Sequence, residues 1–169
     1  MTTLKEKIQN DLTKATKEKE VLSASALRML SAAILNKEKE KRYKIIKAEP
    51  ELTEEELVRK SQLTDEEVIQ VISSEIKKRK ESILEFKKGE RQDLVEKEKA
   101  EIEILKKYLP EQLSEEDIKK LAKEVIEKVG AKEQKDMGRV MQELTPQLKG
   151  KSEGATVSKI VKELLTRTQ

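Results

Sequence analysis

The chain has 169 residues, of which 42% are charged and only 2% are aromatic, and it contains no histidine and no cysteine. This composition excludes disulfides, thiolate or imidazole metal sites, and catalysis by cysteine or histidine. The 37 basic and 34 acidic residues interleave, so neither a basic tail nor a polybasic anchor is expected.

A highly charged chain with few aromatic residues can build long helices that each carry one apolar stripe. Strong helical periodicity argues against disorder, which is the alternative for such a composition. No apolar run approaches the roughly 18 residues of a membrane span. The first residues also lack the apolar core of a signal peptide. We therefore expect a cytoplasmic protein with no membrane partner.

Apolar residues recur at helical spacing near the N-terminus and predict two helices: Leu4, Ile8, Leu12 and Ala15 in the first, and Leu27, Leu30, Ala33 and Ile34 in the second. The charged segment that follows could extend the second helix until Pro50 interrupts it. Thr53 with Glu56 forms a capping box, which predicts a short helix to about Lys60.

A second capping box, Thr64 with Glu67, begins a longer helix. Its seam has near-heptad spacing and includes one arginine: Val68, Ile72, Ile76, Arg79, Ile83 and Phe86. We expect Gly89 to end this helix in the left-handed conformation. The next helix, over about 92–108, should pair with it as a long antiparallel hairpin, with Glu98 and Glu101 facing outward or pairing with lysines.

Pro110 interrupts the pattern, and Ser114 is the expected N-cap of a helix that Gly130 ends. Two short helices then flank a basic loop, TPQLKGKSEG, over 145–154. The fold class is therefore all-α, with an N-terminal helical domain (1–109) that carries the hairpin and a small C-terminal three-helix domain (111–169). Because about 60 residues are near the lower limit for independent folding, the small domain is expected to lean on the hairpin.

Two short patterns resemble catalytic motifs but lack their context. Gly150-Lys151-Ser152 matches the end of a phosphate-binding loop, yet Thr145 stands where that loop needs glycine and a helix precedes it instead of a strand. Ser74 and Lys77 fit S-x-x-K without the partner motifs of serine acyl enzymes. We therefore expect no catalytic residue, no cofactor and no metal.

The best candidate site is a basic cluster around the C-terminal glycines. Its members are candidates for contact with RNA phosphates: Lys135, Arg139, Lys149, Gly150, Lys151, Gly154, Lys159 and Lys162. The alternative is an ordinary solvated lysine surface, which a net charge of only +3 favours on composition alone. Met137 and Met141 are expected to be core residues and not a partner-binding stripe.

Several strings, in order, resemble the YqeY family, also called GatB/YqeY domain proteins: EIKKRKESILEF, GERQDLVEKEKAEIEIL, YLPEQLSEEDI and DMGRVMQELTPQLKGKSEG. The resemblance covers nearly the whole chain. It implies an all-helical protein in two parts, the second similar to the tail domain of GatB, a subunit of the glutamine-dependent aspartyl/glutamyl-tRNA amidotransferase.

In that family picture the tail domain contacts tRNA, while ammonia production and amide transfer belong to other domains and subunits. The matching residues are Met137, Gly138, Val140, Met141, Gly150, Lys151 and Gly154. The chain departs from the family at Arg139, where lysine is common, at Glu153, where aspartate is common, and in the segment 43–62, which looks like an insertion.

The resemblance thus implies a non-catalytic, tRNA-binding module. Any label of carbon–nitrogen ligase activity with glutamine as amido-N-donor would be inherited from the shared domain. One alternative is a protein-interaction adaptor with no RNA role, based on the charged hairpin over 64–109. Another is an enzyme that acts only within a complex, supplying a basic surface to amidotransferase subunits.

Overall fold

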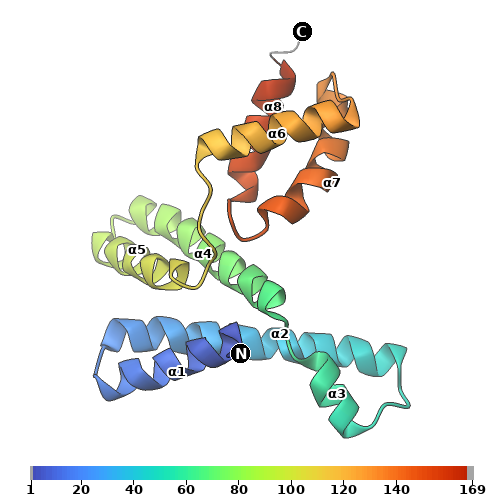
Figure 1. The fold of residues 1–169 in the computed structure, drawn as a ribbon. Helices are drawn as coiled ribbons and strands as arrows, with labels where there is room; N and C mark the ends of the chain where they lie inside the picture. Colours follow the sequence, from blue (N-terminus) through green and yellow to red (C-terminus); the bar gives the residue numbers. More distant parts are fainter. Residues whose placement is uncertain (1, 167–169) are drawn as a thin grey trace. The chain divides into compact units, whose positions relative to one another are not determined.

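The computed structural model describes residues 2–166, and these form eight α-helices and one short 3₁₀ turn without any strand. The all-α prediction is therefore confirmed. The chain divides into two compact units that adjoin in sequence between Leu109 and Pro110 (Figure 1).

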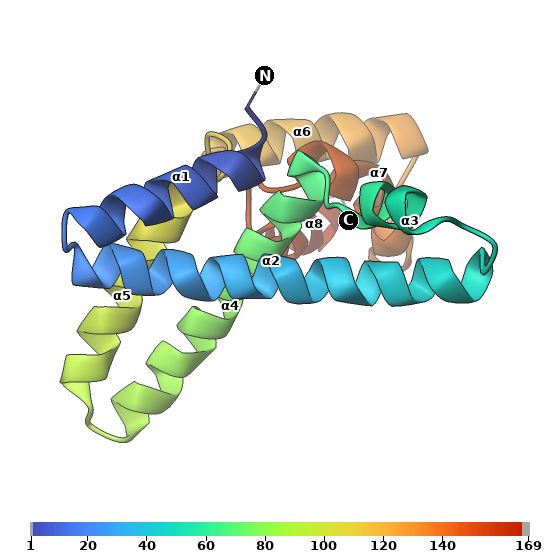
Figure 2. The ribbon, with the colours of Figure 1, turned by 90° about the horizontal axis from the view of Figure 1, so that it is seen from below.

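The first unit contains five helices: α1 (Leu4–Lys17), α2 (Val21–Ala48), α3 (Glu54–Ser61), α4 (Asp65–Lys88) and α5 (Gln92–Lys106). The long helix α2 contacts each of the other four. As Figure 2 shows, α1 runs along the first half of α2, α3 lies by its second half, and the adjacent helices α4 and α5 cross it. Its core is one apolar cluster: Ile8, Leu27, Leu30, Ile34, Val68, Val71, Ile72, Ile76, Ile102, Leu105 and Tyr108.

Local capping signals begin several of these helices as the sequence predicts. The hydroxyl of Thr64 accepts from the Glu67 N–H (3.3 Å), and the Glu67 carboxylate accepts from the Thr64 N–H (2.8 Å). Thr53 and Glu56 form the same reciprocal pair at α3, and a third such box, Thr3 with Glu6, begins α1. Each box satisfies backbone donors that a helix start leaves without partners.

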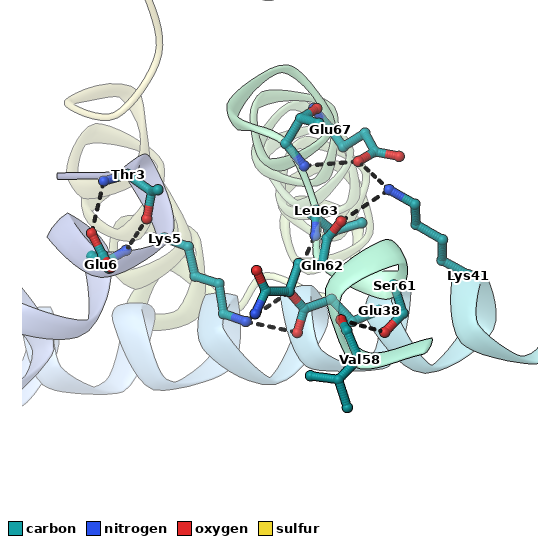
Figure 3. A network of polar contacts seen from close by, with 11 residues as sticks. Thr3, Lys5, Glu6, Glu38, Lys41, Val58, Ser61, Gln62, Leu63 and Glu67 are labelled. Atoms are coloured by element: carbon teal, nitrogen blue, oxygen red, sulfur yellow. Dashed lines mark hydrogen bonds and ion pairs between the residues drawn. The ribbon is translucent and has the colours of Figure 1, made fainter. Parts of the chain in front are cut away.

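Charged side chains of α2 connect its neighbours (Figure 3). The carboxylate of Glu38 accepts from Lys5 of α1 (2.7 Å) and from the Leu63 N–H (3.3 Å). Lys41 donates to the Gln62 carbonyl (2.9 Å) and to Glu67 (2.7 Å). These contacts fix the turn between α3 and α4 against α2.

A buried ionic cluster lies between α4 and α5. Arg79 is 4% exposed, and its Nε donates to Glu101 Oε2 (3.1 Å) while Nη1 donates to Glu75 Oε2 (3.1 Å). Glu98 Oε2 is 3.9 Å from Nε, and burial, with the charge of Glu101, raises the pKa of Glu98. The expectation that Glu98 and Glu101 face outward or pair with lysines is wrong, because the buried guanidinium draws both carboxylates inward.

The end of α4 also differs from the expectation. Gly89 caps the helix with φ −85°, and the left-handed residue is Glu90, with φ +55°. The Glu90 N–H donates to Lys87 O (3.2 Å) and the Arg91 N–H to Phe86 O (2.9 Å), which together make a Schellman motif. Gly89 therefore ends the helix as expected, but it is the C-cap with a negative φ, and the left-handed position falls on Glu90, the next residue.

The second unit contains α6 (Glu115–Val129), a 3₁₀ turn (Gln134–Asp136), α7 (Met137–Leu148) and α8 (Gly154–Thr166). The three α-helices contact one another pairwise around an apolar core: Ile118, Ala122, Val125, Ala131, Val140, Leu144, Leu148, Val157, Ile160, Val161 and Leu165. Met137 and Met141 pack against this core, as expected.

Both predicted boundaries of α6 are confirmed: Ser114 Oγ accepts from the Asp117 N–H (3.2 Å), and Gly130 adopts φ +63°. The expected loop over 145–154 is too long, however, because α7 continues through Pro146 to Leu148. Leu144 and Leu148 are both buried one turn apart, and this burial offsets the hydrogen bond that the proline removes.

Candidate functional site

The loop between α7 and α8, residues 149–153, contains the centre of the basic cluster. Gly150 adopts φ +74°, a conformation that favours glycine, and the Lys151 N–H donates to the Leu148 carbonyl (2.9 Å). This turn closes α7 and directs the chain into α8.

Two residues that precede α6 hold the loop in place through its backbone. The side chain of Gln112 donates to the Gly150 carbonyl (2.7 Å), and the Leu113 N–H donates to the Lys151 carbonyl (2.9 Å). Both lysine side chains of the loop remain exposed. The loop therefore has a fixed backbone and free ammonium groups. Sequence reasoning missed Gln112, because nothing in the local pattern joins two segments nearly 40 positions apart.

The loop also contains a polar atom without a partner. The hydroxyl oxygen of Ser152 is buried and has no hydrogen-bond partner, alone among the buried side-chain polar atoms of residues 2–166. Buried polar groups are nearly always satisfied, so an exception calls for an explanation such as a bound ion or water. Gly154, two residues later, begins α8 and is exposed.

At the other end of α7, Lys135 and Arg139 are engaged by acidic neighbours. Lys135 Nζ is 3.0 Å from Glu133, and Arg139 donates to Asp136 Oδ1 (3.0 Å). Asp136 also accepts from the backbone N–H groups of Lys132 and Glu133, and these two bonds, aided by Arg139, lower its pKa. Asp136 thus organises the turn before α7, a role that sequence reasoning missed.

Lys159 and Lys162 lie on the exposed side of α8, opposite a buried stripe of Val157, Ile160, Val161 and Leu165. The α8 end that holds Lys162 contacts the 3₁₀ turn, since Gln134 Nε2 donates to Thr166 Oγ1 (2.9 Å).

The structure therefore separates the eight predicted residues. Lys149, Gly150, Lys151 and Gly154 gather after the end of α7, whereas Arg139 lies about 15 Å away at ten residues of helical rise, Lys135 precedes α7, and Lys159 and Lys162 are on α8. Lys149, Lys151, Lys159 and Lys162 have no carboxylate within ion-pair distance in the part of the chain that is described. We call these four lysines, together with Gly150 and Ser152, the lysine surface.

Within the described range, no group of three or more acidic side chains has the arrangement to hold a metal ion. None of the helices there is both long enough and apolar enough to cross a membrane.

Comparison with known proteins connects most of this chain to a family. A protein of Pyrenophora tritici-repentis, altered inheritance of mitochondria protein 41, mitochondrial, is 29% identical over 163 residues, which is 94% of this chain and 79% of the relative. An uncharacterized protein of Schizosaccharomyces pombe is 49% identical over 51 residues, 30% of this chain and 42% of that relative. The family model for Yqey-like protein matches residues 38–165, which is more than half of the chain and includes the lysine surface. The chain therefore belongs to the Yqey-like protein family.

Proposed function

We propose that the chain is a non-catalytic helical module whose second unit binds tRNA through the lysine surface. The observation that carries this proposal is the set of four lysines that have no carboxylate partner among residues 2–166, two of them in a loop whose backbone is held by hydrogen bonds. Phosphate contacts are mainly electrostatic and sequence-independent, and they do not require the aromatic platforms that this chain lacks.

The orphan hydroxyl of Ser152 supports the same proposal. A serine hydroxyl can donate to a phosphate oxygen, and here it lies in the loop between Lys151 and the start of α8. A bound phosphate would satisfy it. The A-form helix of tRNA suits such a site, because its shape and backbone can be recognised without reading bases.

The similarity to the GatB tail domain suggests where such a module works. We propose that it associates with a glutamine-dependent tRNA amidotransferase or another protein that handles tRNA, and that it contributes no chemistry of its own. A carbon–nitrogen ligase activity would then belong to the partner subunits. Activity of the purified chain alone on glutamine and misacylated tRNA would contradict this assignment.

Binding of bulk tRNA over about 50 to 200 mM salt tests the proposal. The parent chain should bind with an affinity that falls steeply with salt. The triple variant Lys149→Gln, Lys151→Gln, Lys159→Gln should bind more weakly, and its log–log salt slope should be smaller by about 2 to 3. A matched control removes three exposed lysines from α6, Lys120→Gln, Lys123→Gln and Lys128→Gln. Equal losses in both triple variants would show that overall charge, not this surface, governs binding.

Ser152→Ala gives an independent test of the loop. Removing an unsatisfied hydroxyl should leave the free energy of unfolding unchanged or higher. If the hydroxyl donates to a phosphate, tRNA affinity should nevertheless fall by about tenfold. An unchanged affinity would remove Ser152 from the site.

We also propose the cytoplasm as the compartment, where aminoacylated tRNA is plentiful. The fungal relative carries the word mitochondrial in its name, so the mitochondrion is the alternative. Immunolocalisation of the endogenous protein against markers for both compartments decides between them.

A further inference from the structure

The first unit contains a groove that the tRNA proposal does not use. It lies between α2 and α4 and encloses about 750 Å³. Its lining is mixed: Met29, Ala32 and Ala33 from α2, Val71 from α4 and Leu63 from the turn between α3 and α4 are apolar, and the other lining residues are polar or charged. Short side chains on a helix allow another backbone to approach closely.

The exposed side of α2 carries four large apolar side chains among its charged ones. Met29, which lines the groove, is 53% exposed and Tyr43 is 59% exposed, and Leu35 and Ile46 are exposed as well. Its opposite face is buried in the core of the first unit through Leu27, Leu30 and Ile34. A helix that is apolar on two faces is typical of one that packs on two sides.

Positively charged side chains outnumber negatively charged ones on the part of α2 beside the groove. From Lys37 to Lys47, α2 carries six basic and two acidic residues. Glu40 pairs with Lys37 (2.9 Å) and Glu67 with Lys41 (2.7 Å). Lys39, Lys44 and Lys47 make no ion pair with any described residue, and Lys47 lies 4.5 Å from the ring centroid of Tyr43. The second half of α2 therefore presents lysines without ion pairs next to a groove that has both apolar and polar lining residues.

We propose that this groove binds an acidic amphipathic helix of a partner protein. The apolar side chains of that helix would pack on Ala32, Ala33 and Val71 between the two helical walls. Its carboxylates would meet Lys44, which lines the groove, and the exposed Lys39 and Lys47 of the same helix, which lie outside the lining. Glu40, Glu67 and Glu75 also line the groove. A polyphosphate backbone, which carries a negative charge at every nucleotide, therefore fits the groove poorly. A partner helix can instead place neutral or basic residues next to these glutamates. This surface is independent of the lysine surface, which belongs to the second unit.

A synthetic peptide of about 18 residues, with leucine at helical i, i+3, i+4 and i+7 spacing and glutamate at most other positions, is a defined probe. Methyl NMR of the full chain should show shifts at Ala32, Ala33 and Val71 when the peptide is added. The same peptide with lysine in place of glutamate should bind at least about fivefold more weakly at low salt. Equal binding of both peptides, or shifts that spare these methyl groups, would overturn the proposal.

Two variants separate groove packing from charge. Ala32→Arg fills the groove but also adds positive charge. If binding requires apolar packing in the groove, this variant should not bind the acidic peptide. If electrostatic attraction alone drives binding, the variant should bind it more tightly than the parent. Lys39→Glu with Lys44→Glu should weaken acidic-peptide binding by at least about fivefold. The matched control, Lys14→Glu with Lys107→Glu, makes the same change in net charge at residues that lie neither in α2 nor in the groove lining. It should keep the parent affinity. Ala32 is exposed, and circular dichroism verifies that each variant is folded.

Other occupants give distinct results in the same spectra. If bulk tRNA shifts the three methyl groups and displaces the peptide, the groove binds RNA and the proposal is wrong. If the shifts appear without peptide and grow with protein concentration, a second copy of the chain occupies the groove, which also overturns it.

Discussion

A single hydrogen bond joins the two ends of the first unit. The hydroxyl of Tyr108 donates to Asp11 Oδ2 (2.8 Å) across 97 positions of sequence, and Lys7 Nζ lies 5.7 Å from the ring centroid. Burial, followed by the hydrogen bond and the charge of Asp11, raises the pKa of Tyr108 well above its usual range. The neutral phenol is therefore the form that the folded protein prefers.

Tyr108→Phe should lower the free energy of unfolding by about 1.5 kcal/mol at neutral pH, because it leaves Asp11 without its donor. A group whose pKa is raised by folding contributes fully to the free energy of unfolding below its pKa in the unfolded chain, which is about 10 for tyrosine. This contribution is lost as the pH rises towards the pKa of the same group in the folded protein. The difference between parent and variant should therefore shrink above about pH 10. Urea denaturation at a series of pH values measures it.

Tyr43→Phe is the control, since its ring is exposed and its hydroxyl makes no hydrogen bond with any described residue. It should leave the free energy of unfolding nearly unchanged at neutral pH. If the difference in free energy of unfolding between the parent and Tyr108→Phe grew as the pH rose, this result would contradict the assigned hydrogen bond.

For single residues, the sequence predicts which positions face the core better than it predicts which charged side chains form pairs. Arg79 is recognisable as a seam residue from its spacing. Glu101 resembles the other glutamates of a charged helix until α4 and α5 are placed side by side, and only then does its pairing with Arg79 follow. Gln112 was missed for the same reason, because its partner is the Gly150 carbonyl, 38 positions away. Asp136 was missed although its partners Lys132, Glu133 and Arg139 are local, because it organises a turn and not a helical stripe.

Helix boundaries are the features that local sequence predicts best here. The capping boxes at Thr53 and Thr64 and the caps at Ser114 and Gly130 need only residues within one turn, and all four are confirmed. The left-handed position at the end of α4 and the end of α7 were predicted wrongly. Gly89 does end α4, but the left-handed residue is Glu90, whereas the burial of Leu148 extends α7 beyond Pro146.

The end of α4 makes a paired prediction. Glu90→Gly should raise the free energy of unfolding by about 0.5–1 kcal/mol, because glycine adopts φ +55° without the steric cost of a Cβ. Gly89→Ala should change it by no more than about 0.5 kcal/mol, since a Cβ there would meet only the carbonyl oxygens of Glu85 and Phe86 at 3.7 and 3.8 Å.

Thermal denaturation followed by circular dichroism compares both variants with the parent. If Gly89→Ala were the damaging change and Glu90→Gly had no effect, the left-handed position would lie at Gly89, as the sequence pattern alone indicates.

Each unit has its own apolar cluster, and the two clusters share no residue. A destabilising substitution in the first unit should therefore leave the second unit folded. Arg79→Met removes the cation from a cluster with buried Glu75 and Glu101, and it should destabilise the first unit by about 3–5 kcal/mol. Both tyrosines, Tyr43 and Tyr108, belong to the first unit, so tyrosine fluorescence reports its unfolding alone.

Amide hydrogen exchange follows the second unit in the same sample. Exchange in α6 and α8 should keep the parent rate in Arg79→Met, and the reciprocal variant Val161→Ala should accelerate exchange in those helices only. Faster exchange of α6 and α8 in Arg79→Met would mean that the two units unfold together. That result would support the expectation that the small C-terminal domain depends on the hairpin for its stability.

The grouping of residues in space is what the sequence predicts least. Eight residues that are close along the chain are distributed over both ends of α7 and along α8, and two of them, Lys135 and Arg139, pair with acidic neighbours. The groove combines the segments 29–44 and 63–78, which are at least 19 positions apart, and no local sequence pattern predicts that they meet.

The contact between Asp11 and Tyr108 has a consequence for how the protein is made. During synthesis the N-terminal helices emerge long before the residue that closes their unit. Until Tyr108 has left the ribosome, Ile8 and the apolar residues of α2 lack the partners that α4 and α5 supply. The nascent chain must therefore carry exposed apolar surface through most of the translation of its first 109 residues, and a chaperone that protects helical intermediates would act in that interval.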